Sequence, residues 1–556
     1  ADRSMRKDVN EAIEQIGFAR YQVVQAIALC GLCISDGAEI LIASGTLPGL
    51  AKGWSIEPFM RGCLVSGIFV GVLFGNLLGG LSADALGRRP TVLAAYAGLI
   101  VAGGCSCLAQ GARGLLCARL LFGVFYGMGI GPSLALQVET SPSRWRAHVV
   151  NLQYLALVVG EIFAAALLVV FMPHLSGAEV QASWRWVVGI AVLPAACLFP
   201  FACAFLQESP HYLVSNGRHA AAKHALYSMA KFSGDTETME EMAPRGAAYS
   251  GVPTVVIAPP RLTSRTPLVW SLPQSDSEKT GWTNRTHTET MTDNSSVVDS
   301  WTTGSQEHTT FLQRAAFVLT SEYLRIVLGG AFMCFVSNLQ FFGLTYALPQ
   351  IFKYNSMPQV RLLPATEMLV VSCCDVPGML LAFYLSSASE IGHRESLTTL
   401  ALVSGVLMLA LTSINRGTEF FWAGLPCAAL AKFTGTALFG LTYAYLAEVF
   451  PSSVRATALS LCMAGGRLGS IAAPVLFEVL AVEGLRVGPH APYMVVSALV
   501  CFAGVVVIKH TLTFELKNEP LEDVSGKTAA RAAARSVDTT AAAAGGGRAR
   551  GALACA

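Results

Sequence analysis

Hydrophobic residues along the chain fall into twelve runs of about 20 residues, the length at which a helix crosses a bilayer. In the first half the runs lie near residues 22–49, 62–83, 91–110, 114–137, 148–173 and 185–206. In the second half they lie near residues 324–349, 364–387, 396–414, 420–446, 456–481 and 491–511. The pattern predicts an all-α membrane protein with twelve transmembrane helices in two halves of six, over residues 22–206 and 324–511.

Polar segments flank and separate the two halves. They are a segment before the first span (1–21), a central loop (207–323) and a tail (512–556). The loop begins with an amphipathic helical pattern from Asn216 to Leu226. Residues 262–310 are rich in Ser, Thr and Asp, and the tail is rich in Ala, Gly and Arg, so we expect both to be disordered.

The composition excludes several classes of protein. Of the 556 residues, 53% are hydrophobic and 13% are charged, whereas a soluble chain is about 25% charged. A net charge of +2 gives no electrostatic footprint for nucleic acid. The cysteines lie mostly inside apolar runs, and the ten histidines have no ligand spacing. We therefore expect no soluble enzyme, no nucleic-acid partner, no metal and no cofactor.

Basic residues predict the orientation of the spans. Most precede or follow spans on one side: Arg3, Arg6, Lys7, Arg20, Arg88, Arg89, Arg144, Arg146, Arg394 and Arg455. Fewer lie on the other side: Lys52, Arg113, Lys353 and Arg361. By the positive-inside rule, both termini and the central loop are predicted to be cytoplasmic. The N-x-S/T sites at Asn284 and Asn294 would then carry no glycan.

A motif recurs at the same place in both halves. Residues 139–146 after the fourth span and 448–455 after the tenth both read E-x-x-P-x-x-x-R, and residues 80–89 read G-x-x-x-D-x-x-G-R-R. These motifs resemble those of the major facilitator superfamily. The resemblance implies a gate that latches the halves on the cytoplasmic side. Its members here would be Asp84, Gly87, Arg88, Arg89, Glu139, Arg146, Glu448 and Arg455. The second-half loop, Ser389 to Arg394, has serine where the acid should stand, which puts a symmetric latch in doubt.

A narrower resemblance extends over nearly all the spans. Residues 17–22 (GFARYQ), 36–39 (DGAE), 184–186 (WRW) and 208–210 (ESP) are similar to those of the synaptic-vesicle-2-related proteins, in the organic-ion branch of the superfamily. This resemblance implies a small organic ion as substrate.

Charged residues inside the spans are the candidate site. Each would cost about 2.5–3.5 kcal/mol at the centre of a lipid-facing helix, so we expect them to face an internal cavity or one another. The alternative is that they form salt bridges that only hold the bundle together. Asn338 and Gln340 are better explained by interhelical hydrogen bonds. The candidates for substrate binding and proton coupling are Asp36, Glu39, Arg119, Glu161, Asp375, Lys432, Arg467 and Asn338.

Depth along the helices predicts a cluster among these residues. At 1.5 Å per residue, Asp36 and Glu39 lie about 24 and 28 Å above Arg20, and Arg119 lies about 30 Å above Glu139. Asp36 and Glu39 share a helix face, so one of the two should hold a transferable proton, with Arg119 as the partner. Asp375 precedes Pro377, which we expect to open the backbone at mid-span.

The residues and the resemblance together predict a secondary transporter of a small organic ion. It would work by alternating access with proton coupling, as a monomer in the plasma membrane or a vesicle membrane. Two alternatives stay open: a facilitative uniporter, and a vesicle-membrane protein of the same fold that binds or scaffolds without transport. No phosphate-binding loop is present, which disfavours ATP-driven transport.

Overall fold

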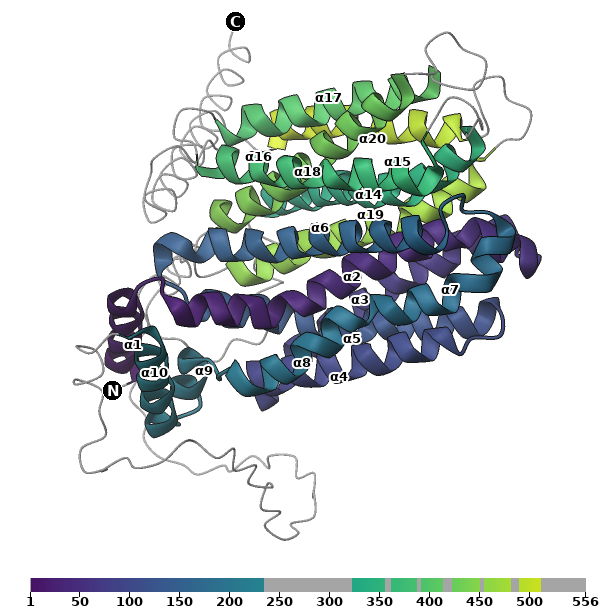
Figure 1. Ribbon diagram of the computed structural model, residues 1–556. Coiled ribbons are helices and arrows are strands. Elements are labelled where there is room, and N and C mark those ends of the chain that lie inside the picture. Colours follow the sequence, from purple (N-terminus) through teal and green to yellow (C-terminus); the bar gives the residue numbers. More distant parts are fainter. Residues whose placement is uncertain are drawn as a thin grey trace, which may run out of the picture. The chain divides into compact units, whose positions relative to one another are not determined.

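The computed structural model describes residues 2–234, 323–355, 362–387, 392–413, 423–450, 455–481 and 490–511. Within these ranges, twelve helical segments are long and apolar enough to cross a membrane, as predicted from the hydrophobic runs. Helices run nearly side by side along the length of the bundle (Figure 1). The expected disorder of residues 262–310 and of the tail lies outside the described residues.

Six spans form the first half. They are α2 (Arg20–Gly53), α3 (Pro58–Leu86), α4 (Arg88–Cys107), α5 (Ala112–Glu139), α6 (Arg146–Phe171) and the pair α7 (Gly177–Ala191) and α8 (Leu193–Phe205). The sixth span begins earlier than predicted, because the Ser176 hydroxyl accepts a hydrogen bond from the Glu179 amide and starts α7 there.

Six further spans form the second half. They are α14 (Tyr323–Asn355), the pair α15 (Pro364–Cys373) and α16 (Asp375–Ser387), α17 (His393–Ser413), α18 (Gly424–Val449), α19 (Arg455–Val479) and α20 (Ala491–Thr511). The predicted break in the eighth span is present, but it lies at Cys374, before Asp375, rather than at Pro377. Pro377 has no amide hydrogen to donate to the Cys373 carbonyl four residues before it, so the break lies one turn ahead of the proline, which then falls in the first turn of α16.

Two stripes of glycine bring α3 and α5 into close contact. A Cβ atom at Gly71 would lie 2.1 Å from the Leu120 carbonyl oxygen, and one at Gly123 would lie 2.0 Å from the Ile68 carbonyl oxygen. Gly75 faces α5 in the same way. Small residues at this spacing allow two backbones to touch, which is the main source of packing contact between helices in lipid.

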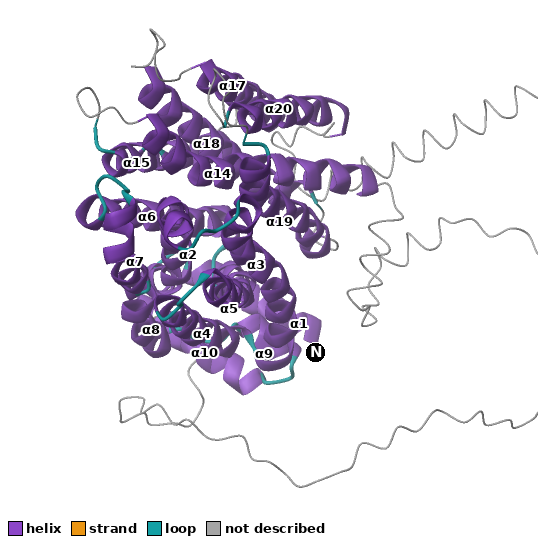
Figure 2. Ribbon diagram, turned by 90° about the vertical axis from the view of Figure 1, so that its right-hand side faces the viewer, coloured by secondary structure: helices purple, strands orange, loops and turns teal. Residues whose placement is uncertain are grey.

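The two halves meet along several pairs of helices. α2 packs against α14, α3 against α19, and α6 against α15, α16 and α18. An end-on view shows the two sets of helices facing each other across this interface (Figure 2). In each pair the two helices come from opposite halves, so a rotation of one half against the other would change these contacts.

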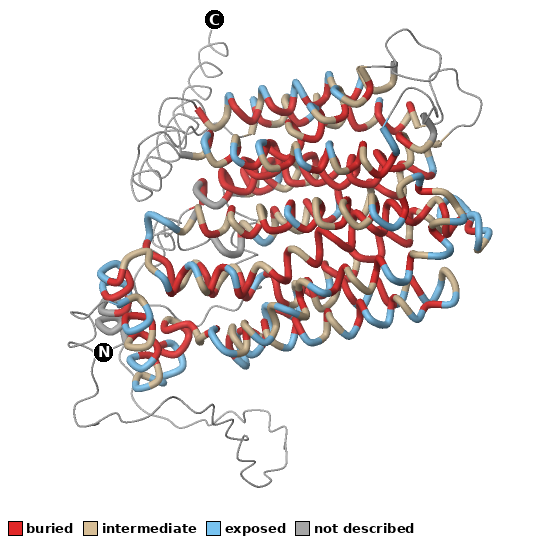
Figure 3. Tube along the Cα trace, viewed as in Figure 1, coloured by how far each residue is buried: buried red, intermediate tan, exposed pale blue. Residues whose placement is uncertain are grey.

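Burial is greatest in the helices at the interface. α2, α14 and α18 are the most buried spans, and buried stretches run through the middle of the bundle in Figure 3. These three helices also contain many of the buried polar and charged residues. Large apolar side chains such as Leu77, Val101, Val170 and Leu499 are exposed on the outer helices. An outer surface of this kind is expected where helices face lipid.

Three short helices form a cap at one end of the first half. They are α1 (Asp2–Ile16), α9 (Pro210–Ser215) and α10 (His219–Ser233), and they share a small hydrophobic core of their own. α10 matches the amphipathic pattern read from residues 216–226, whereas α1 lies in a segment for which only polarity was predicted. We call this end of the bundle the cap end; the basic-residue bias predicts that it faces the cytoplasm.

Candidate functional site

A buried ion cluster joins the two halves. Lys432 on α18 places its Nζ atom 2.8 Å from Glu161 Oε2 on α6 and 3.1 Å from Asp375 Oδ2 on α16. It also donates to Thr345 Oγ1 on α14, at 2.6 Å. The Thr345 hydroxyl lies 3.2 Å from the second carboxylate oxygen of Glu161, Oε1. These four side chains are fully buried, and we refer to them as the Lys432 cluster.

The helix break in the eighth span positions Asp375. Because α15 ends at Cys373, Asp375 lies in the first turn of α16, where free backbone amides and the helix dipole favour a negative charge. The Thr436 hydroxyl donates to Asp375 Oδ1. Asp375 is therefore held by its own half, with one oxygen on Thr436 and the other facing Lys432.

Glu39 and Arg119 form a second buried ion pair, inside the first half. Arg119 Nε lies 3.6 Å from Glu39 Oε1, and both side chains are about 1% exposed. Within the described part of the chain, neither carboxylate oxygen of Glu39 has a hydrogen-bond partner. Arg119 also donates to the Leu64 carbonyl at 3.4 Å. The pair is thus a close charge contact without a well-formed hydrogen bond.

Asp36 has partners that the sequence did not single out. Its carboxylate interacts with the charge of Glu39, as the spacing predicted, and also with the Tyr126 side chain on α5 and with the charge of Arg467 on α19. Arg119 contacts Glu39 directly. Both acids therefore face α5, and Asp36 interacts with the second half as well.

Close helix packing also brings Glu161 near Asp36. A Cβ atom at Gly37 would lie 2.1 Å from the Leu157 carbonyl oxygen, and one at Gly160 would lie 2.1 Å from the Ile34 carbonyl oxygen. α2 and α6 therefore touch backbone to backbone, and the charges of Asp36 and Glu161 interact.

Aromatic side chains from both halves lie beside the Lys432 cluster. The Lys432 ammonium lies 4.2 Å from the centre of the Phe341 ring, which stacks on Phe439 at 4.9 Å. Tyr154 of the first half contacts Phe439 edge to face at 5.4 Å and stacks on Tyr443 at 5.3 Å. The interface between the halves at this depth is thus aromatic on both sides.

Asn338 forms hydrogen bonds between helices, the explanation that the sequence favours for it over substrate binding. Its amide donates to the Tyr443 hydroxyl at 2.8 Å and accepts from Ser470 at 3.0 Å. These bonds join α14, α18 and α19 within the second half. Asn338 is satisfied by them and by the Cys334 carbonyl, which accepts from its amide at 2.7 Å.

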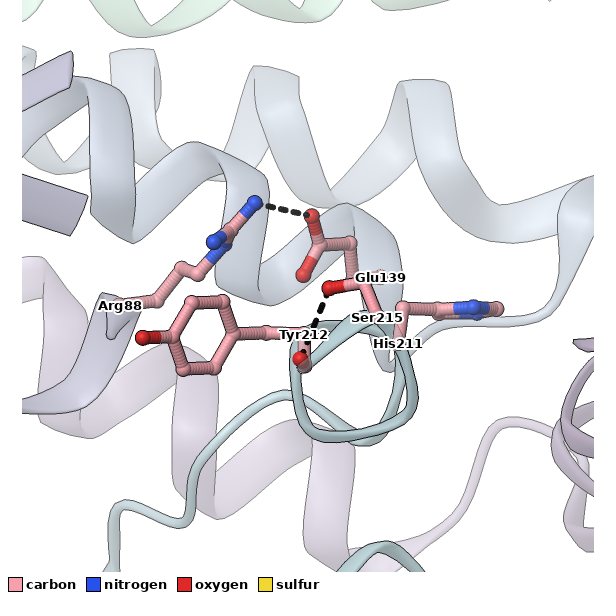
Figure 4. Close-up of a pocket in the computed structure, with 5 residues that line it drawn as sticks. All are labelled: Arg88, Glu139, His211, Tyr212 and Ser215. Atoms are coloured by element: carbon pink, nitrogen blue, oxygen red, sulfur yellow. Dashed lines mark hydrogen bonds and ion pairs between the residues drawn. The ribbon is translucent and has the colours of Figure 1, made fainter. Parts of the chain in front are cut away.

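The expected gate motif builds a network at the cap end. Arg88 lies 3.6 Å from Asp84 and 3.5 Å from Glu139, and its guanidinium covers the Tyr212 ring at 4.7 Å. In the close-up, the Arg88 guanidinium points toward the Glu139 carboxylate (Figure 4). A cavity of about 200 Å³ lies here, lined by Arg88, Glu139, His211, Tyr212 and Ser215.

Gly87 makes the turn between α3 and α4. Its φ is +113°, and a Cβ atom there would lie 2.2 Å from Glu208 Oε2. The Glu208 carboxylate accepts from the Arg88 amide at 3.0 Å and from the Arg89 amide at 3.3 Å. Only glycine fits this position, because both the backbone angle and the approaching acid exclude a side chain.

The described contacts of this network lie within the first half and the cap. Arg88 contacts Asp84, Glu139 and Tyr212, and the carbonyls of Cys203 and Ser141 accept from Arg89 and Arg146. The side chains of Glu448 and Arg455 lie outside the described residues. Among the described side chains, the motif therefore braces the first half against the cap.

Contacts between the halves are polar at the end opposite the cap. Arg61 on α3 lies 4.0 Å from Glu478 on α19, and Glu478 accepts from the Tyr346 hydroxyl at 2.6 Å. The Lys353 ammonium donates to the Leu175 carbonyl, and the Ala365 amide donates to the Pro173 carbonyl at 3.2 Å. The halves are held together at this end.

Sequence reasoning missed several of these residues. Thr345 is a member of the Lys432 cluster, and Thr436 binds the Asp375 carboxylate of that cluster. Tyr154 and Phe439 form the aromatic contact between the halves. Threonine inside an apolar span is common, since its hydroxyl can bond within its own helix. No local signal therefore singles out these positions; they are recognisable only once the helices are packed.

Comparison with known proteins agrees with this architecture. The family model described as Sugar (and other) transporter matches residues 51–251 and 270–526. An organic cation/carnitine transporter 7 from Arabidopsis thaliana is 24% identical over 542 residues, which cover 94% of this chain and 97% of that protein. A synaptic vesicle 2-related protein from Xenopus laevis is 23% identical over 85% of this chain and 75% of that protein.

Solved structures share the fold. The inward open form of the xylose transporter XylE from E. coli superposes with a TM-score of 0.63 at 15% identity, over 91% of this chain and 98% of that one. The family match covers most of the chain, the fold is shared, and the Arabidopsis relative aligns over 97% of its length. The chain belongs to the Sugar (and other) transporter family and is a membrane transporter, not an enzyme, of the major facilitator superfamily in its synaptic-vesicle-2-related and organic-ion branch.

Proposed function

We propose that the protein is a secondary active transporter that carries a small organic ion by alternating access and couples this movement to a proton. The observation that carries the proposal is the Glu39–Arg119 pair. Glu39 is a buried carboxylate with no hydrogen bond to its oxygens from the described residues, 3.6 Å from a guanidinium. A proton on such a carboxylate breaks no hydrogen bond, but it leaves the buried Arg119 charge without its partner, so protonation of Glu39 would be linked to a change in what Arg119 contacts.

The balance of buried charge supports a proton. Among the described residues, the ion groups buried within the spans away from the helix ends comprise four acids (Asp36, Glu39, Glu161 and Asp375) and three bases (Arg119, Lys432 and Arg467). Two further buried acids, Glu367 and Glu478, lie in the first turn of α15 and the last turn of α19. An uncompensated charge inside a membrane protein is costly. One proton among the four acids restores neutrality, and its release to one side of the membrane would supply the driving step.

The contacts between the halves support alternating access. The halves are joined by polar contacts at the end opposite the cap and by the Glu161–Lys432 pair at mid-span. Both sets depend on the relative position of the halves. A rigid rotation that parts one set would expose the interior to the other side of the membrane.

Uptake into proteoliposomes tests the proposal. Labelled organic anions and cations are screened at fixed membrane potential, with equal pH on both sides or with acid on one side. We expect one class to accumulate only with the pH gradient, and Glu39→Gln to lose this dependence while substrate exchange at equal pH continues.

The matched control is Glu11→Gln, which neutralises an exposed acid of the cap. It should keep gradient-driven uptake. Wild-type uptake that ignores the gradient would make the protein a uniporter, and a reconstituted protein that moves no organic ion in either condition would favour a binding or scaffold role.

A further inference from the structure

Glu161 occupies a two-point carboxylate site on the opposite half. One of its oxygens lies 2.8 Å from Lys432 Nζ, and the other lies 3.2 Å from the Thr345 hydroxyl. Both of these groups belong to the second half, on α18 and α14. A charged donor and a neutral donor, one for each oxygen, is the arrangement by which proteins bind a carboxylate.

The rest of the Lys432 cluster stays with the second half. The ammonium has three hydrogens, and three oxygens surround it, from Glu161, Asp375 and Thr345. Asp375 and Thr345 lie on the same half as Lys432, whereas Glu161 alone comes from the first half. If the halves part, Glu161 leaves and the Lys432 ammonium loses one buried partner, whereas the Thr345 hydroxyl can turn to the Phe341 carbonyl of its own helix, 3.0 Å away.

A buried donor without a partner is costly, so the vacated place favours a new acceptor. We propose that Lys432 and Thr345 form a cradle for the carboxylate of the transported substrate, and that Glu161 fills this cradle when the substrate is absent. The substrate class is thus an organic anion with a carboxylate group. This inference rests on the transport function proposed above and adds the sign and the chemistry of the substrate.

The aromatic side chains around the cradle indicate the chemistry of the rest of the substrate, beyond its carboxylate. Phe341 lies under the Lys432 ammonium and stacks on Phe439, and Tyr154 approaches Phe439 from the first half. A planar apolar body would gain both burial and ring contacts here. We therefore expect an aromatic carboxylate to bind more tightly than a short aliphatic one.

Asp375 limits the charge that the cradle accepts. It lies 3.1 Å from Lys432 and is also bonded to Thr436. With Glu161 absent, Lys432 and Asp375 balance each other, and an incoming anion adds one negative charge where Glu161 had carried one. Replacing Glu161 by an anionic substrate therefore leaves the net charge of the site unchanged. A cationic substrate would make the net charge of the site more positive.

The test removes the Glu161 side chain from the cradle and measures whether small ions bind in its place. The full-length protein is purified in detergent as wild type, Glu161→Ala and Glu161→Gln, and thermal unfolding is measured against benzoate, propionate and benzylammonium. Benzylammonium matches benzoate in size and carries the opposite charge. Glu161→Gln keeps an amide oxygen in the cradle, so it serves as the filled control.

We expect benzoate to raise the Tm of Glu161→Ala in a concentration-dependent way and more than propionate does. The shift should be smaller for wild type and Glu161→Gln, in which residue 161 competes for the cradle. Adding Thr345→Val to Glu161→Ala should weaken benzoate binding about tenfold, the size of one hydrogen bond to a charged group. Adding Lys432→Met should abolish it.

Three results would overturn the cradle. The first is stabilisation of Glu161→Ala by benzylammonium in place of benzoate, and the second is no change in the Tm of this variant with either probe. The third is a Tm shift with benzoate that is equal in Glu161→Gln and Glu161→Ala, which would mean that benzoate binds at another site. Glu161→Ser is run in parallel in case the alanine variant does not fold. Failure of benzoate to rescue the folding of either variant also counts against the proposal. Because these readouts need no transport, they stand apart from the proton-driven uptake that tests the proposed function.

Discussion

Glu161 and Lys432 lie 2.8 Å apart, although 271 residues separate them in the chain and they belong to opposite halves of the protein. Both side chains are fully buried. Removing one member of such a pair leaves a charge without compensation, which costs about 3–5 kcal/mol. The pair is therefore stable only while the halves keep this relative position, or while something else takes the place of one partner.

The Glu39–Arg119 pair predicts an order among substitutions of Arg119. Arg119→Ala should destabilise the protein by about 3–5 kcal/mol, because Glu39 would be left as an unpaired buried acid. Arg119→Lys keeps the charge and should destabilise it less, with a larger residual rate of uptake. Thermal unfolding and proteoliposome uptake measure the two effects.

The double variant Arg119→Ala with Glu39→Gln supplies the control for this order. It removes both charges, so it should recover part of the stability lost in Arg119→Ala. An Arg119→Ala protein that unfolds and transports like wild type would mean that the pair has no part in either property.

The glycine stripe on α3 predicts a contrast between two neighbouring positions. Gly71→Ala would place a Cβ atom 2.1 Å from the Leu120 carbonyl oxygen, so α3 and α5 must move apart. Overpacking of this kind costs about 1–3 kcal/mol. Gly80→Ala, on the same helix, meets nothing within 4 Å. We expect a lower Tm for Gly71→Ala alone; equal Tm values for the two variants would contradict the close contact.

Contacts of α1 predict a pH-dependent attachment of the cap. The Glu14 carboxylate accepts from the Ser143 amide at 2.7 Å, and mainly this bond lowers the pKa of Glu14 below its ordinary value of 4.5. The charge of Arg146 acts in the same direction. Because the folded pKa is lowered, the contribution to docking is complete above pH 4.5 and is lost as the pH falls through the lowered value.

Hydrogen exchange of the amides in residues 9–16 measures this attachment. At neutral pH, Glu14→Gln should increase the exchange rate by roughly a few-fold, since an exposed contact contributes little. Glu11→Gln changes another exposed acid of the same helix and should leave the rate unchanged. Equal rates for Glu14→Gln and wild type would show that the bond does not hold α1.

The bias of basic residues predicts the topology of the central loop. With the loop in the cytoplasm, trypsin added to sealed right-side-out vesicles should leave Arg285 and Arg314 uncut. Detergent-opened vesicles are the control, in which both sites should be cleaved. Efficient cleavage in the sealed vesicles would place the loop on the outside and reverse the assigned orientation.

The hydrophobic pattern by itself determined the number and position of the spans. Twelve apolar runs appear as twelve spanning helical segments, because in lipid a segment must satisfy its backbone internally and the helix does so from local sequence. The repeated motif and the polar residues inside the spans were visible for the same reason. Each is a local departure from an apolar background.

Tertiary structure alone decided which charges meet. Spacing predicted that Asp36 interacts with Glu39, but it did not predict that Asp36 also interacts with Arg467 from the other half. Nor did it predict that Lys432 joins Glu161 across the interface. Helical periodicity gives the face and the depth of a residue but not the neighbour that its face meets. That neighbour depends on the rotation and register of packed helices, which the glycine contacts of α2, α3, α5 and α6 determine at backbone distance. The same packing brings Thr345 to Glu161, and no local feature of the chain distinguishes that threonine from any other in a span.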